Sequence, residues 1–150
     1  MATQPDTSGL LGTESQPIHF PAGLIGFGEW QNFVLVAHTA GGPLRLMQSL
    51  DDERVSFIVV DPRHIVSDYY PQLQEEDIEA LQIVGDFEAA WPNEIGVYCI
   101  LSVHEDPFVV TANLLSPLII NWHAGLGRQV ILANSGYAAR HPVVSAEEKA

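Results

Sequence analysis

The 150-residue sequence predicts a mainly β fold: a small closed or partly open β-barrel or sandwich of about eight short strands with one or two short helices. Two observations lead to this class. Short apolar segments recur along the chain between turns rich in Gly, Pro, Asn and Asp, and a single segment shows helical spacing of its apolar residues. Strands this short and numerous usually close into a barrel or pack as two sheets, because both arrangements limit exposed sheet edges.

Turn residues divide the first part of the chain into four expected strands. Pro21 ends the first strand, and the Gly-rich apolar segment 22–28 is predicted to form a turn region. The fourth strand is apolar except for Ser56, which predicts that it is buried on both faces. The four expected strands are 18–20, 32–38, 44–49 and 55–60.

Two helical segments are expected after these strands. Asp61 suits a helix N-cap and Pro62 suits the first helical position, so a short helical turn is predicted there. A longer helix is predicted over 74–84, with Gly85 closing its C-terminus. The helix dipole stabilises acidic residues in the first turn, and apolar residues three apart predict one buried face. The acids are Glu75, Glu76 and Asp77, and the apolar residues are Ile78, Leu81 and Val84.

The second half of the chain returns to β structure. Four further strands are expected, and a loop at 123–127 is predicted to join the last two as a hairpin. The ends of the chain are polar and lack periodicity, which predicts flexible tails at 1–15 and 143–150 around a single domain at 16–142. The expected strands are 96–103, 108–113, 118–122 and 128–133.

The net charge of −13 is concentrated in one part of the sequence. Residues 51–106 contain fourteen acids and two arginines, whereas residues 107–146 contain two arginines and no acid. This polyanion cannot neutralise phosphates, which excludes direct nucleic-acid binding and adhesion to an anionic membrane, and it favours a basic partner. The acidic block is interpreted either as a solvated face or as a docking or repelling surface.

The residues that carry chemistry do not form an enzyme motif. Cys99 lies in an apolar strand segment, which predicts a buried and inert thiol. The six histidines lack the i, i+4 spacing of a helical zinc site, no Gly-x-Ser-x-Gly motif occurs, and the single lysine is Lys149. We therefore expect a binding protein without metal or cofactor.

The sequence shows neither a signal peptide nor a long apolar run, which predicts a cytoplasmic protein.

Six stretches with distinctive sequences follow one another between about residues 18 and 142. They are Phe20-Pro21-x-Gly23-Leu24-Ile25-Gly26-Phe27, Leu46-Met47-Gln48-Ser49-Leu50-Asp51-Asp52, Phe57-Ile58-Val59-Val60-Asp61-Pro62, the long Thr111-Ala112-Asn113-Leu114-Leu115-Ser116-Pro117-Leu118-Ile119-Ile120-Asn121, Gly127-Arg128-Gln129-Val130 and Tyr137-x-x-Arg140-His141-Pro142. In this order they resemble the flagellar assembly factor family, FliW. The core-rich chain without ligand spacing predicts a monomer when the protein is free. The resemblance implies a non-enzymatic regulator that binds and antagonises the RNA-binding translational repressor CsrA. Binding of flagellin would then release CsrA, so that partner switching controls flagellin synthesis.

Eight residues are candidates for partner binding. The acids of the expected helix could steer a basic partner, and polar residues at two strand ends could face a partner instead of holding turns. Leu114 is predicted to be a core residue. The alternative to the regulator is a small β-barrel ligand-binding protein or enzyme, with a pocket lined by Trp30, Trp91 or Trp122 and a histidine. The eight candidates are Gln48, Ser49, Glu75, Glu76, Asp77, Asn113, Leu115 and Ser116.

Overall fold

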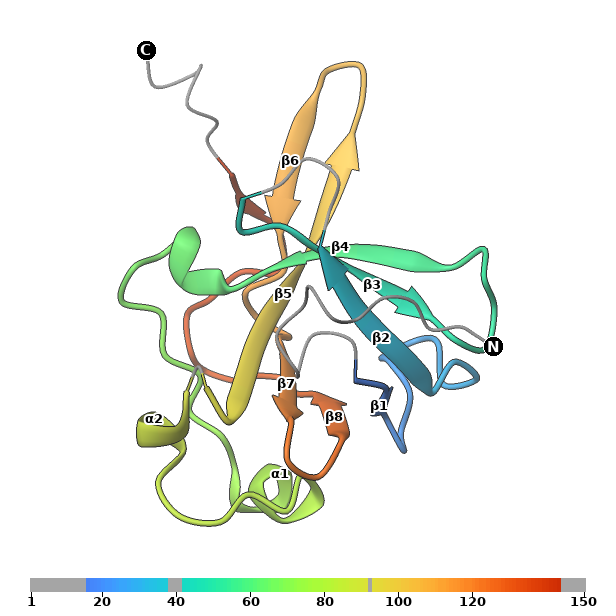
Figure 1. Cartoon of the computed structure of the whole chain (residues 1–150). Helices are drawn as coiled ribbons and strands as arrows, with labels where there is room; N and C mark the ends of the chain where they lie inside the picture. Colours follow the sequence, from blue (N-terminus) through green and yellow to red (C-terminus); the bar gives the residue numbers. More distant parts are fainter. Residues whose placement is uncertain (1–15, 38–41, 92, 144–150) are drawn as a thin grey trace.

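Seven short strands close into a barrel, and two more extend the sheet beyond it (Figure 1). This computed structural model describes residues 16–37, 42–91 and 93–143. The strands are β1 (Ile18–His19), β2 (Asn32–Ala37), β3 (Arg45–Ser49), β4 (Ser56–Val60), β5 (Ile95–His104), β6 (Val109–Ala112), β7 (Leu118–Asn121), β8 (Leu126–Gln129) and β9 (His141–Pro142). The helical elements are the 3-10 turn η2 (Pro62–His64), α1 (Glu75–Ala80) and α2 (Phe87–Ala90).

The barrel runs in the order β4, β3, β2, β1, β8, β7 and β5, and the pairing of β5 with β4 closes it. The closing pairs are antiparallel and include Val59 opposite Ile100. The parallel contact in the ring joins β1 to β8, where His19 lies opposite Leu126. The predicted mainly β class is therefore confirmed, and of the barrel or sandwich that the sequence allowed the structure is a closed barrel.

The apolar residues form two cores on opposite faces of β5 and β7. One core fills the barrel and includes Phe20, Phe33 and Ile120. The other includes Leu81 and Trp91, and it lies where the segment between β4 and β5 covers the outer face of those two strands. All four residues of β7 are buried as a result.

Burial on both faces was predicted for the strand at 55–60, and this prediction is wrong for its first half. Ser56 is exposed and Ile58 is half-buried, and the fully buried residues of β4 are Val59 and Val60. The reason is that β4 pairs with β5 only from Ile58 onward, so its first residues lie outside the doubly covered part of the sheet.

The helix predicted over 74–84 ends early. Leu81 is its C-cap and is buried, but Gln82 adopts a φ of 58°, and Val84 is 92 % exposed. The side-chain amide of Asn121 in β7 donates hydrogen bonds to the carbonyls of Leu81 and Gln82, at 2.8 and 3.2 Å. These bonds satisfy the carbonyls at the end of the helix, so the chain turns four residues sooner than the predicted closure at Gly85.

The turn at Asp61 forms as predicted. The Asp61 carboxylate accepts a hydrogen bond of 2.9 Å from the amide of Arg63, and Pro62 occupies the first helical position of η2.

None of the helices in the described ranges has the length and apolarity that crossing a membrane requires.

The last hairpin is tighter than predicted. The loop was expected to extend to Gly127, but Leu126 and Gly127 already pair with β7, and β8 ends at Gln129 instead of 133. A Cβ atom on Gly127 would lie 2.5 Å from the ring of Phe20, so the absence of a side chain allows β8 to pass directly beneath this ring. The short strand β9, which was not expected, pairs with β6, and Val143 beyond it donates a hydrogen bond to Val110.

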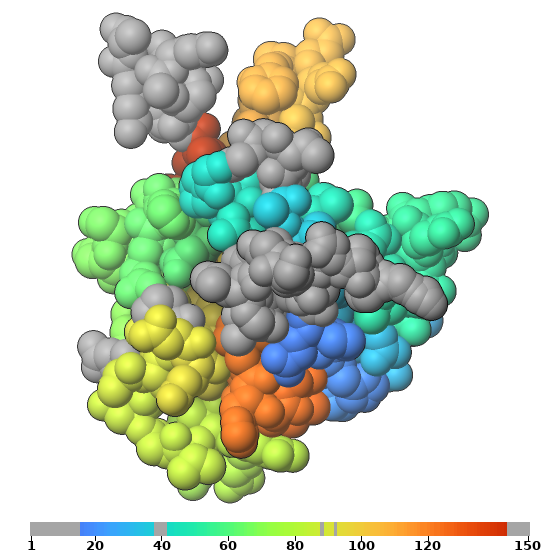
Figure 2. Space-filling model, in the orientation of Figure 1, coloured from blue at the N-terminus to red at the C-terminus, as the bar shows by residue number. Residues whose placement is uncertain are grey.

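The β5–β6 hairpin projects from the body of the molecule (Figure 2). Its strands pair from Leu101 to His104, while the first half of β5 pairs with β7 in the barrel wall. One long strand thus belongs both to the barrel and to the projecting hairpin.

Cys99 has no exposed surface, as predicted. Burial raises the pKa of its thiol to about 12, so the reactive thiolate does not form near neutral pH.

We expect Leu114→Ala to lower the free energy of unfolding by roughly 2–5 kcal/mol, because it leaves a cavity in the outer core. Leu114 is 1 % exposed, and its carbonyl accepts a 2.7 Å hydrogen bond from the Tyr69 hydroxyl. Urea denaturation followed by tryptophan fluorescence measures the change. Ile131→Ala is the control, since Ile131 is 57 % exposed and its truncation should cost within about 0.5 kcal/mol. Equal stability of the parent and the Leu114 variant would contradict the prediction.

Candidate partner-binding surfaces

Gln48 and Ser49 hold the β3–β4 turn. The hydroxyl of Ser49, which is 2 % exposed, accepts hydrogen bonds of 3.0 Å from the amides of Asp51 and Asp52. The side-chain amide of Gln48 donates to the carbonyls of Glu53 and Val55. These bonds give both residues a structural role, and a contribution to a partner surface stays a prediction.

Asp51 connects this turn to the start of β2. Its carboxylate accepts hydrogen bonds from the amides of Gln31 and Asn32, at 2.7 and 2.9 Å, and from the Asn32 side chain at 3.2 Å. The amides of Asn32 and Gln31 lower the pKa of the Asp51 carboxyl below its ordinary value, because they stabilise the charged form.

The three acids predicted at the start of the helix have different roles. Asp77 is buried, takes part in the capping box of α1 and accepts a 2.8 Å hydrogen bond from Nε of Arg128 in β8. Glu76 contacts the same guanidinium at 3.3 Å, but its side chain is 80 % exposed. Glu75 is exposed. Asp77 therefore ties α1 to the barrel, while the side chains of Glu75 and Glu76 face solvent.

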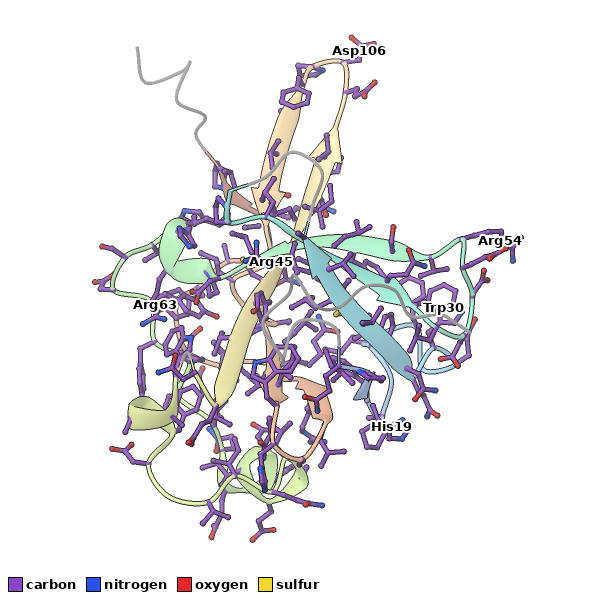
Figure 3. All side chains as sticks on the ribbon, viewed as in Figure 1. His19, Trp30, Arg45, Arg54, Arg63 and Asp106 are labelled. Atoms are coloured by element: carbon purple, nitrogen blue, oxygen red, sulfur yellow. The ribbon has the colours of Figure 1, made fainter. Side chains whose placement is uncertain are left out.

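The acidic block does not form one face in the structure. Asp52 of the β3–β4 turn pairs with Arg54, and Figure 3 shows Arg54 far from Asp106 at the tip of the β5–β6 hairpin. A third group lies on and after α1, where Glu75, Glu79 and Asp86 are exposed. A basic partner would therefore meet separate acidic patches.

Asn113 and Ser116 shape the corner between β6 and β7. The side-chain oxygen of Asn113 accepts a 3.0 Å hydrogen bond from the amide of Ser116, which is itself buried. Gln129 of β8 donates a 3.0 Å hydrogen bond to the Ser116 carbonyl, and Leu115 is half-buried. Of these predicted residues, Asn113 also borders a hollow.

This hollow, which we call the groove, has a volume of about 450 Å³. It lies between the segment 24–27, the β5–β6 hairpin and the chain around Arg140. Its described lining contains seven apolar side chains from strands and turns that are distant in the sequence, together with polar residues. The lining residues are Leu24, Ile25, Phe27, Phe57, Ile100, Leu101, Ser102, His104, Thr111, Asn113, Gln129, Ala139 and Arg140.

The rim of the groove is built by the Gly-rich segment that was predicted as a turn. Gly23 has a φ of 69°, and a Cβ atom there would lie 2.5 Å from Cα of Gly28, so the two ends of the turn touch. Ile25 and Phe27 project from this turn, 50 and 44 % exposed. Sequence reasoning missed both residues, although apolar side chains in a Gly-rich turn were a signal of exposed apolar surface.

In the described part of the chain, neither of the two hollows lined by a histidine has the tryptophan that the alternative function requires. Trp91 and Trp122 belong to the two cores, and Trp30 stacks on Phe27 with ring centroids 5.1 Å apart. The two described hollows that contain a histidine, His104 in one and His123 in the other, have no tryptophan in their walls. Among the described residues, no group of three or more His, Cys, Asp or Glu is placed to hold a metal ion.

Comparisons with known proteins agree on one family. The chain matches the family model described as "FliW protein" over residues 6–143. It is 33 % identical over 128 residues to the flagellar assembly factor FliW of Thermoanaerobacter pseudethanolicus, covering 85 % of this chain and 81 % of the relative. The corresponding protein of Desulfitobacterium hafniense (strain Y51) is 34 % identical over 130 residues, covering 87 % and 82 %. A crystal structure of the flagellar assembly factor FliW superposes with a TM-score of 0.73 at 35 % identity, covering 86 % of each chain.

We expect Asp51→Asn to destabilise the protein at neutral pH, with a smaller effect in acid. The folded-state pKa of Asp51 is lowered, so its contribution is complete above the ordinary carboxyl pKa of about 3.9 and is lost as pH falls through the lowered value. Urea denaturation at pH 7 and at successively lower pH should show the difference between parent and variant shrinking. Glu53→Gln, in the same exposed turn, controls for the loss of one charge. A difference independent of pH would contradict the role of the ionised carboxylate.

Proposed function

Because the chain belongs to the FliW family of flagellar assembly factors, we propose that it is a non-enzymatic regulator that binds and antagonises the translational repressor CsrA. Binding of flagellin releases CsrA, which is then free to repress flagellin synthesis. In this proposal the protein acts in the cytoplasm as a monomer when free, and it binds neither nucleic acid nor membrane. Competing affinities for two proteins are sufficient for this switch, and no catalytic step is needed.

The charge of the protein supports an antagonist of an RNA-binding partner. The net charge of −13 attracts a basic protein and repels the phosphates of RNA that approach the same complex. The exposed acids Glu75 and Glu79 on α1 are suited to this role because they face solvent, whereas Asp77 is held by Arg128. We propose α1 as the patch that faces CsrA.

A small-molecule function has less support. The groove lies within the usual range of ligand pockets, about 300–1,000 Å³. However, its described lining has one histidine and no carboxylate, cysteine or lysine, so it lacks the carboxylate pair of an acid–base site and offers only the hydroxyls of Ser102 and Thr111 as nucleophiles. Native mass spectrometry of the purified protein tests this alternative, and a retained small molecule would favour it.

The partner switch can be tested with three purified proteins. CsrA is captured on this protein immobilised on a biosensor, and flagellin monomer is then added in increasing concentration. We expect CsrA to leave as flagellin binds, with a midpoint set by the two affinities. A stable complex of all three proteins, or the absence of CsrA binding, would contradict the proposal.

The role of α1 can be tested by reversing charge at two places. We expect Glu75→Lys with Glu79→Lys to slow association with CsrA more than Glu53→Lys with Glu105→Lys does. Both double variants change the net charge from −13 to −9, so a difference between them reports position and not total charge. Association rates are measured at two salt concentrations, because exposed charges are screened over about 8 Å at physiological salt.

The outcomes of this comparison are distinct. Lysine at the start of α1 destabilises the helix by about 0.3–1 kcal/mol, so folding is first checked by thermal denaturation. Equal slowing by both double variants would mean that net charge steers the encounter. No slowing by either, at either salt concentration, would mean that the acids only solvate the surface.

A further inference from the structure

The groove is bordered by apolar side chains that are partly exposed to solvent. Ile25 and Phe27 are 50 and 44 % exposed on its rim, and Val109 on the adjacent hairpin is 40 % exposed. Phe57 and Ile100, which pack against the barrel core, form part of its lining, so the apolar surface continues from the core to the rim. Contiguous exposed apolar surface of this kind marks an interaction site.

The charge of the groove is opposite in sign to that of the whole protein. Its described lining contains no carboxylate, although the chain carries 19 acids. Arg140 is its one residue that is positively charged at any physiological pH, and this arginine is exposed and forms no ion pair with a described residue. The groove therefore suits an apolar segment that carries a carboxylate, and it does not suit a basic face.

A second hollow of about 300 Å³ continues the groove toward α1. The two hollows share Ile25 and Gln129, and the second is also lined by Ile131, which is 57 % exposed. Its wall also contains Glu76, Asp77 and Arg128, and the Arg128 guanidinium contacts both carboxylates. Two carboxylates against one arginine give this hollow a net charge of −1, so the strip formed by the two hollows has Arg140 at one end and a net negative charge at the other. An amphipathic helix matches such a strip, because it has an apolar face, a positive N-terminal end and a negative C-terminal end.

We propose that the groove binds an amphipathic helix of flagellin, with apolar side chains against Ile25 and Phe27 and an acidic C-terminal end beside Arg140. This proposal rests on the proposed function, in which flagellin is the second partner. It assigns flagellin to the apolar groove and CsrA to the exposed acids Glu75 and Glu79 of α1. The two surfaces meet at Glu76 of α1, which lines the second hollow, so flagellin bound along the strip excludes CsrA from that helix.

The test measures the affinity of intact flagellin monomer for variants of the full chain. Ile25→Asp places a charge on the apolar rim, and Ser102→Trp fills the groove. We expect each to weaken flagellin binding by about tenfold or more, as is typical for a central interface residue. Val84→Asp is the control for Ile25→Asp, since it gives the same net charge of −14 at a residue that is 92 % exposed and does not line the groove.

Arg140 tests the charge of the occupant. We expect Arg140→Glu to weaken flagellin binding by about three- to tenfold, and Arg140→Lys to restore most of the affinity. Arg54→Glu is the matched control, because both reversals change the net charge from −13 to −15 and Arg54 lies in the distant β3–β4 turn. CsrA affinity should stay within about twofold of the parent value in all groove variants if that partner uses another surface.

Each result decides the proposal. Groove variants that fold and bind flagellin like the parent would overturn it while leaving the proposed function intact. A parent protein that does not bind flagellin at all would overturn both. If Ile25→Asp changes the molar mass in solution, measured by light scattering, then the groove holds a second copy of this chain and the proposal is wrong. Should Ile25→Asp fail to fold, Ser102→Trp and Arg140→Glu decide the question.

Discussion

Hydrogen bonding between β4 and β5 is the constraint on which the rest of the structure depends. These pairs, from Ile58 opposite Leu101 to Val60 opposite Cys99, close the sheet into a barrel and separate the inner core from the outer one. Beyond Leu101, β5 no longer pairs with β4, and it continues with β6 as the projecting hairpin. The closure of the barrel therefore also determines where the groove begins. Ile100 packs against the barrel core and also lines the groove.

Local signals were enough to predict most of the elements. Asp61 followed by Pro62 predicted a helical turn, and the strand positions followed from turns that contain Gly, Pro and Asp. The end of α1 could not be predicted, because the group that caps it is the side chain of Asn121, forty residues away. The faces of β4 could not be assigned either, since a dense apolar run does not show which side the segment between β4 and β5 will cover.

The candidate site was predictable only in part, for the same reason. Asn113 was chosen as a polar residue at a strand corner, and it borders the groove. Ile25 and Phe27 were missed because their exposure depends on the folded shape of the loop, in which Gly23 and Gly28 come into contact. The acids of residues 51–106 are continuous only in the sequence, and the fold distributes them over the β3–β4 turn, the segment on and after α1 and the β5–β6 hairpin.

Two neighbouring residues of β8 have consequences for communication between the surfaces. Gln129 accepts a hydrogen bond from the amide of Ile25 on the groove rim and donates one to the corner at Ser116. Arg128, the preceding residue, holds Asp77 of α1. A ligand that displaces β8 at Gln129 also displaces Arg128, the preceding residue, and with it the contact that holds α1. Any resulting change in affinity at α1 must be matched by an equal change at the groove, because allosteric coupling between two binding sites is reciprocal.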